Sequence, residues 1–345
     1  MGVYVTRTLK SNYHVQTYIK DNMDNKINFM SRILAEHGNL NRVEFGDALW
    51  NSVLRPSISH CCGAWLTSSK VNEDLLSSIQ FRAAKIIMKT KVNMSKAALL
   101  IELGWEPIND FLNRQRASYF SYINNLPNKR LCKIVFDEMH ALSAHAWDYL
   151  PALKTVFESV GLDYLYHVND FNKERFNAFM GQFSSTKLRN EIMSKSSLRD
   201  YITFYRHKGK QPYLEDMRDF EGSRLKLLCR TNSLCLNNLL NKMSLKNSNK
   251  CSLCDCNVVE DLCHFLLLCP ALEKIRRPLL NDISFNTVEL DFVDLPNYIK
   301  IKLLIGDCGF YINEIEGMYL DVIGRNLLKK LYHERNIILA QSNVL

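Results

Sequence analysis

The chain has 345 residues, of which 47% are hydrophobic and 23% charged, a balance that excludes a disordered tail and predicts a buried core. It contains only 13 Gly and 8 Pro, which favours long helices over a turn-rich β architecture. The formal net charge of +8 is compatible with a polyanionic partner, and no stretch approaches the roughly 18 apolar residues that a membrane span needs.

The first residues, Met1 to Arg7, lack the apolar segment of a signal peptide. Without an export signal, the eleven cysteines are interpreted as reduced thiols and not as a disulfide framework, and their odd number agrees with that interpretation. The sequence therefore predicts a cytoplasmic and/or nuclear protein with no membrane partner.

Apolar residues recur at helical spacing through most of the N-terminal part of the chain. Asn41 and Ser95 are expected helix caps, and Pro56, Gly104 and Pro127 are expected to end helices. The predicted helices cover residues 18–34, 41–56, 72–87, 95–104, 107–127 and 129–142. We group them as a helical region over residues 1–142.

Periodicity is weaker over residues 143–222, which we interpret as a variable helical linker region. Ser223 is the expected cap of a basic helix, which leads into a cysteine-rich segment, and the two together occupy residues 223–280. A last helical stripe over residues 315–339 lies in a C-terminal tail of residues 281–345. The predicted fold class is mainly α.

Cys251, Cys254, His264 and Cys269 have the spacing C-x2-C-x9-H-x4-C. Two cysteines three residues apart on a turn can both face one ion, and a His and a Cys from the next element can complete a tetrahedron. The basic run before Cys251 favours the thiolate form that binds metal. Four protein ligands leave no position for water, so the sequence predicts one structural Zn²⁺ ion.

The alternative for this segment is a set of buried free thiols beside an ordinary histidine. Cys256 and Cys263 are two further cysteines that could replace a ligand. Cys263 adjoins His264 in a predicted helix over residues 258–268, so their side chains should diverge by about 100° and only one should face the ion. The identity of the ligands therefore stays open between these cysteines.

Basic residues gather before and after the predicted ligands, and residues 223–254 contain no acidic side chain. Clustered Lys and Arg bind phosphates and release their counterions, so RNA and/or DNA is the predicted partner. The candidate contacts are Arg224, Lys226, Arg230, Lys242, Lys246, Lys250, Arg276 and Arg277. The alternative for each is a solvated position, on a helix face or at the edge of the cysteine-rich segment, with no partner.

From Cys251-x2-Cys254 the chain continues to Glu260-Asp261-x2-His264-Phe265-Leu266-Leu267-Leu268-Cys269-Pro270 and then Arg276. This segment resembles the zinc knuckle near the C-terminus of non-LTR retrotransposon reverse transcriptases. Other segments similar to that family are Met1-Gly2-Val3-x-Val5-Thr6, Leu49-Trp50-x2-Val53-x2-Pro56, Gly63-Ala64-Trp65, Glu102-Leu103-Gly104-Trp105 and Arg230-Thr231-Asn232. Asn232 departs from the family, because glycine is usual there. The resemblance covers most of the chain and is weakest over residues 143–222.

The resemblance implies a thumb-like region over residues 1–142, and a zinc knuckle that helps to hold template RNA and target DNA in full-length polymerases. Such polymerases hold two metal ions with aspartates, including an adjacent Asp-Asp pair, and this chain has no Asp-Asp dipeptide. We therefore expect a C-terminal fragment with no catalytic residue and no enzyme activity. Its expected partner in the full-length parent is the missing N-terminal polymerase core.

Two other functions stay open. One is an inert or co-opted zinc-stabilised helical protein with no role in nucleic-acid binding. The other is a partner-binding zinc module of ubiquitin-ligase type, which needs about eight ligands for two ions. Residues 251–269 offer only five cysteines and one histidine, which disfavours this last function.

Overall fold

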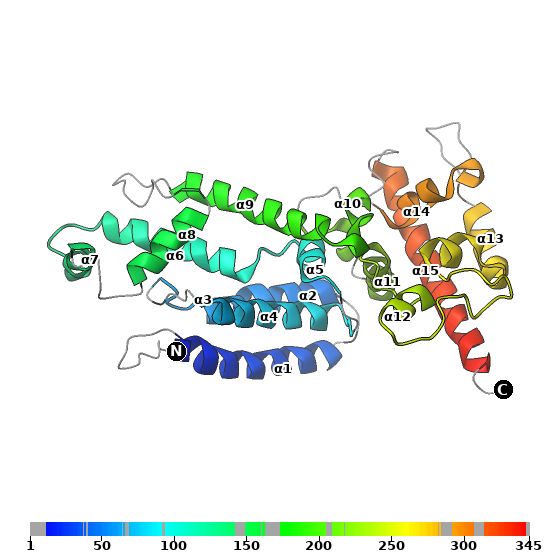
Figure 1. The fold of residues 1–345 in the computed structure, drawn as a ribbon, viewed down its shortest axis with the longest axis horizontal. Coiled ribbons are helices and arrows are strands. Elements are labelled where there is room, and N and C mark those ends of the chain that lie inside the picture. The colour runs from blue at the N-terminus through cyan, green and yellow to red at the C-terminus, as the bar shows by residue number, and fades with distance from the viewer. Residues whose placement is uncertain are drawn as a thin grey trace. The chain divides into compact units, whose positions relative to one another are not determined.

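The protein is mainly α, as its computed structural model shows (Figure 1). The structure describes residues 12–36, 38, 41–63, 65, 69–91, 94–141, 149–159, 161–162, 173–204, 209–216, 218–281, 283, 292–306 and 314–342. Across these residues the only β pairing is an isolated antiparallel bridge between Lys250 and Val259. The predicted fold class is confirmed.

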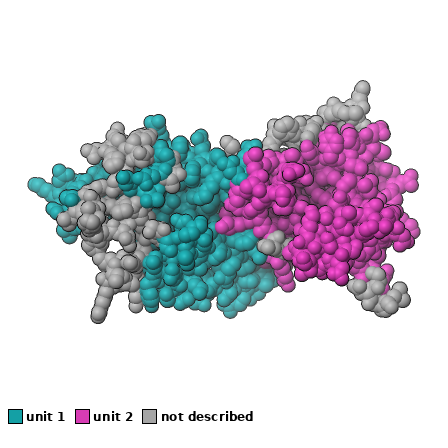
Figure 2. Space-filling model, viewed as in Figure 1, with its two compact units in different colours: residues 1–38, 44–87, 105–190 teal, residues 39–43, 88–104, 191–345 magenta. Residues whose placement is uncertain are grey.

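The chain divides into two compact units (Figure 2). Unit 1 contains residues 1–38, 44–87 and 105–190, and unit 2 contains residues 39–43, 88–104 and 191–345. Each unit therefore combines segments that are far apart in the sequence. The four-segment division made from the sequence stays a prediction.

Unit 1 contains an aromatic core. Phe120 packs edge-on against Phe136 and Phe157, with ring centroids 5.7 and 5.5 Å apart. Phe157 also contacts Phe176, at 5.4 Å between centroids, and all four rings are buried. Burial of such rings supplies apolar area and favourable edge contacts. The helices of this unit are η1 (His14–Ile19), α1 (Lys20–Glu36), most of α2 (Arg42–Leu49), η2 (Trp50–Leu54), α3 (Arg55–Ser59), α4 (Lys70–Ile87), α6 (Ile108–Asn124), α7 (Leu131–Ala141), α8 (Tyr149–Ser159) and most of α9 (Lys173–Met193).

Unit 2 is organised by the long C-terminal helix α15 (Glu314–Ser342), which packs against α11 (Phe220–Arg230) and α14 (Asn297–Ile305). The fully buried apolar residues of α15 include Leu320, Leu327 and Leu331. The other helices of the unit are α5 (Lys96–Leu103), η4 (Ser196–Leu198), α10 (Tyr201–Phe204), η5 (Pro212–Leu214), α12 (Asn237–Lys242), η6 (His264–Leu268), η7 (Pro270–Leu272), α13 (Glu273–Asn281) and η8 (Phe292–Asp294).

Helix α5 begins and ends where its sequence predicts. The Ser95 hydroxyl accepts a hydrogen bond from the N–H of Ala98 at 3.5 Å, and Gly104 ends the helix in the left-handed conformation at φ +66°. A side chain at Gly104 would also overlap the backbone nitrogen of Lys210. Glycine is required here by the positive φ angle and by the close approach of the backbone at Lys210.

Two predicted helix boundaries are wrong. Asp219 and not Ser223 caps α11, because its carboxylate accepts the N–H of Gly222 at 3.1 Å. Ser223 lies inside the helix, where its hydroxyl donates to the carbonyl of Tyr213 at 2.6 Å. Pro56 lies in the first turn of α3, which continues directly from η2, so it does not end the helical run.

A buried ionic network joins segments of unit 2 that are distant in sequence. Arg230 donates from Nε to Glu102 at 2.8 Å, and the Tyr213 hydroxyl donates to the other carboxylate oxygen at 2.7 Å. Arg230 also donates to the carbonyl of Ile305 at 3.2 Å and to the side chain of Gln211 at 3.3 Å. The buried charges of Glu102 and Arg230 thereby neutralise each other and are hydrogen-bonded, as burial in an apolar interior requires.

Asn232 follows α11 with φ +48°, in the left-handed region. Asparagine is among the few residues other than glycine that adopt this conformation routinely. Its side chain also donates to the carbonyl of Ser197 at 3.3 Å. Asparagine at position 232 therefore permits the left-handed turn.

Candidate metal centre

A short antiparallel turn presents the first two cysteines of the predicted site. The N–H of Cys251 donates to the carbonyl of Val258 at 2.8 Å, and the N–H of Glu260 donates to the carbonyl of Asn249 at 2.9 Å. These two bonds close a loop over residues 251–258, which contains Cys254. The loop returns the chain to the point where the second pair of ligands begins.

The second pair of ligands lies on the π-helical turn η6 and just after it. Asp261 accepts the N–H of His264 at 2.8 Å, which satisfies an otherwise unpaired donor at the start of this turn. The N–H of Cys269 donates to the carbonyl of His264 at 2.7 Å, and Pro270 follows at once. His264 and Cys269 are therefore held at opposite ends of one turn.

The four predicted ligand atoms converge. The sulfurs of Cys251 and Cys269 are 3.9 Å apart, and the Cys254 sulfur is 3.5 Å from Nε2 of His264. All four atoms lie within 4.8 Å of one another. With Zn–S bonds of about 2.3 Å and Zn–N bonds of about 2.0–2.1 Å, a tetrahedron requires S–S and S–N separations of about 3.8 and 3.6 Å. The cluster is close enough to bind a metal ion.

The residues of the cluster shift one another's protonation. The hydrogen bond between Cys251 and Cys269, followed by burial, raises the pKa of Cys251, and the same bond lowers the pKa of Cys269. Burial lowers the pKa of His264, which favours the neutral imidazole that binds metals. The N–H of Leu253 donates to the Cys251 sulfur at 3.4 Å. Neighbouring thiols oppose each other's ionisation, and a divalent cation between them reverses that preference.

Cys256 and Cys263 do not belong to the converging group. Cys256 is exposed and Cys263 is half-buried, whereas Cys251, His264 and Cys269 are buried. The side chain of Cys256 stays close enough to Cys254 to raise the pKa of Cys254, although burial of Cys254 has the larger effect. The geometry thus favours the four ligands chosen from spacing over the two alternatives.

Glu260 stabilises the loop of residues 251–258, a role that the sequence did not predict for it. Its carboxylate accepts two hydrogen bonds from Arg335 on α15, at 2.7 and 2.9 Å, and a third from the N–H of Asn237 at 2.7 Å. The Asn237 side chain in turn donates to the carbonyl of Lys250 at 2.6 Å and to the hydroxyl of Ser252 at 2.8 Å. Helix α15 therefore anchors the cysteine-bearing loop through a buried ion pair.

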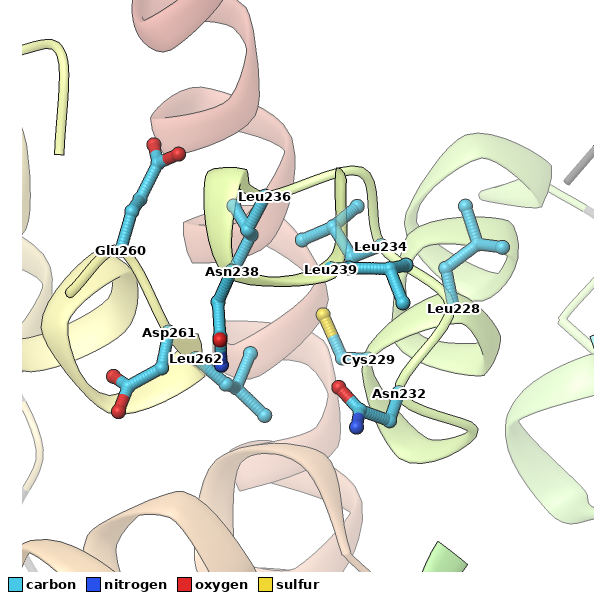
Figure 3. A pocket seen from close by; sticks show the side chains of 10 residues that line it. All are labelled: Leu228, Cys229, Asn232, Leu234, Leu236, Asn238, Leu239, Glu260, Asp261 and Leu262. Atoms are coloured by element: carbon cyan, nitrogen blue, oxygen red, sulfur yellow. The ribbon is translucent and has the colours of Figure 1, made fainter. Parts of the chain in front are cut away.

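A small cavity adjoins this loop (Figure 3). Its volume is about 30 Å³, enough for a water molecule and too small for a substrate. Glu260, Asp261 and Leu262 lie on one side of it, and Leu228, Leu234, Leu239 and Cys229 lie on the other. The lining residues are Leu228, Cys229, Asn232, Leu234, Leu236, Asn238, Leu239, Glu260, Asp261 and Leu262.

Three of the eight candidate nucleic-acid contacts are buried, which corrects their assignment to an exposed face. Lys226 is 2% exposed and donates to Asp321 at 2.6 Å and to the carbonyl of Gly306. Arg230 is 2% exposed in the Glu102 network, and Arg276 is 3% exposed. Their charges are held by groups of the protein itself, so in this fold these side chains cannot reach a phosphate.

The other five candidates lie nearer the surface. Arg224 is half-buried and pairs with Glu221 at 2.5 Å. Lys246 is half-buried and donates to Asn237 at 2.8 Å. The exposed candidates are Lys242, Lys250 and Arg277. Arg276 and Arg277 are neighbours on α13 and point about 100° apart, so burial of one agrees with exposure of the other.

Comparison of the chain with protein-family models, with curated proteins and with solved structures gives no match. In the part of the chain that the structure describes, no helix combines the length and the apolar character that crossing a membrane requires.

Proposed function

We propose that Cys251, Cys254, His264 and Cys269 bind one Zn²⁺ ion that stabilises the fold of unit 2. The observation that carries the proposal is the convergence of three sulfurs and one imidazole nitrogen at tetrahedral spacings. Mixed thiolate and imidazole ligands suit zinc, and four protein ligands fill its coordination shell. The ion supplies structural cross-linking there and no catalytic water.

The test is metal analysis of purified protein with two matched double variants. The wild-type chain should contain one zinc per molecule, and Cys251→Ser with Cys254→Ser should abolish it. Cys256→Ser with Cys263→Ser removes the same number of thiols outside the converging group and should leave the zinc content unchanged. Zinc loss from the second variant but not from the first would refute the ligand assignment.

We further propose that the chain binds RNA or single-stranded DNA weakly, with little sequence preference. Support comes from the resemblance to the thumb and zinc-knuckle region of non-LTR retrotransposon reverse transcriptases. It also comes from the segment of residues 242–250, which has exposed lysines at both ends and no acidic residue. The buried Lys226, Arg230 and Arg276 are not part of this proposed interface. No catalytic step is assigned to the chain.

The salt dependence of binding tests this second proposal. A single strand should give a log–log slope of about −0.7 for each phosphate neutralised. Replacing Lys242, Lys250 and Arg277 with Ser should flatten the slope while leaving the zinc content intact. The control replaces Lys20, Lys70 and Lys129, three exposed lysines of unit 1, and removes the same charge. Equal slopes in both variants would favour a zinc-stabilised helical protein with no nucleic-acid role.

A further inference from the structure

Arg276 contacts the backbone of the turn that bears His264 and Cys269, two of the proposed ligands. Its Nη1 donates to the carbonyl of Leu267 at 2.8 Å, and its Nη2 donates to the carbonyl of Cys269 at 2.5 Å. The side chain is 3% exposed, and its Nε has no hydrogen-bond partner among the residues that the structure describes. A fully charged guanidinium is therefore held in the interior, in contact with the backbone of a metal ligand.

The proposed centre itself carries a charge that requires compensation. Zn²⁺ with three thiolates and one neutral imidazole has a formal net charge of −1, and this step of the argument rests on the proposed zinc site. Cys251, His264 and Cys269 are at most 8% exposed, so most of this charge is removed from water. A buried net charge is costly unless a charge of opposite sign lies close to it.

The other charged groups near the centre are paired with protein groups, exposed to water or of the same sign as the centre. Arg335 is neutralised by the two bonds it makes to Glu260. Asp261 is exposed and has the same sign as the centre. Glu273 pairs with Arg276 at 2.8 Å, but its own side chain is 53% exposed and its charge is screened by water.

We propose that Arg276 is the internal counter-cation of the three-thiolate centre and a positioning residue that sets its affinity for zinc. The hydrogen bonds to the Leu267 and Cys269 carbonyls place the guanidinium at the end of the ligand-bearing turn, where cations are favoured.

The test measures the zinc dissociation constant by competition with a chromophoric chelator. Arg276→Gln keeps hydrogen-bond donors but removes the charge, and it should weaken zinc binding about 10- to 100-fold, the range for residues that support metal ligands. Arg276→Lys keeps the charge and should lose less. Lys274→Gln makes the same change in net charge at an exposed position of the same helix and should bind zinc like the wild type.

A role limited to capping the carbonyls predicts equal losses for Arg276→Gln and Arg276→Lys, and that result would overturn the proposal. The second readout changes the charge of the centre. Cys254→His makes the ligand set neutral, and in this background Arg276→Gln should cost clearly less affinity than in the wild type. If Cys254→His binds no zinc, the comparison of Arg276→Lys with Arg276→Gln still tests the proposal. A wild-type chain without zinc would refute the zinc site itself, and equal affinity of wild type and Arg276→Gln would refute only the role of Arg276.

Discussion

The two units bury different kinds of side chain. In the described part of unit 1, the aromatic cluster around Phe157 forms a core, and the buried charged residues are Asp110 and Arg116. The described part of unit 2 contains many more buried charged residues. Its buried charged residues are Arg42, Glu102, Lys226, Arg230, Glu260, Arg276, Glu316, Arg325 and Arg335.

This difference has a physical consequence for how each unit is specified. Apolar side chains of similar volume can replace one another in a core at small cost, whereas a buried charge tolerates only a partner of opposite sign in good geometry. Unit 1 should therefore depend on apolar volume. Unit 2 should depend on particular ion pairs and on the metal ion.

Metal removal should have the largest effect and should act on unit 2. Structural zinc in small modules is worth roughly 10–16 kcal/mol in apparent binding free energy, so chelation should open the loop around Cys251 and Cys269. Hydrogen exchange of their two N–H groups, which bond to Val258 and His264, measures this opening. The amides of α6 in unit 1 are the reference. Equal loss of protection in both units would contradict the comparison.

Breaking the Glu102–Arg230 pair should have the next largest effect on the free energy of unfolding. Arg230→Met leaves an uncompensated buried carboxylate and should lower the free energy of unfolding by about 3–5 kcal/mol in urea titrations. The double variant with Glu102→Gln should recover part of that loss. The control is Lys70→Met, since Lys70 is 78% exposed and its pairs should contribute at most about 1 kcal/mol. An equal loss in both single variants would show that burial of the pair is irrelevant.

The aromatic core of unit 1 should respond to volume. Phe157→Ala leaves a cavity and should cost about 3–5 kcal/mol, whereas Phe157→Leu should cost at most about 1.5 kcal/mol. Both values come from urea titrations, and neither variant should change the zinc content. A Leu variant as destabilised as the Ala variant would show that this core, like unit 2, requires one specific side chain.

The smallest predicted effect concerns the backbone of unit 2 at Asn232. Asn232→Ala places a residue with a poor left-handed propensity at φ +48° and should cost about 1–2 kcal/mol. Asn232→Gly loses the same side-chain bond to Ser197 but permits the angle, so it should be the more stable of the two. Thermal melting of the two variants measures the difference. The reverse order would mean that the side-chain contact and not the backbone determines the effect.

The sequence predicted the mainly α fold, helix α5 with its cap at Ser95, and the four converging residues of the candidate metal centre. It was wrong about Ser223, because a serine before an apolar run looks the same as a cap whether or not Asp219 caps the helix earlier. It was also wrong about three basic residues on the proposed interface. Charge counts alone do not show that Lys226, Arg230 and Arg276 are paired inside the protein.

What the sequence by itself determined was local. Cys251, Cys254, His264 and Cys269 are close in the chain, and a turn and a short helix suffice to bring them together. Only the tertiary structure decided which charges became structural. Glu102 meets Arg230 across 128 residues, and Glu260 meets Arg335 across 75. Such pairs form only when packing removes both partners from water, so the pattern of residues along the chain does not reveal them.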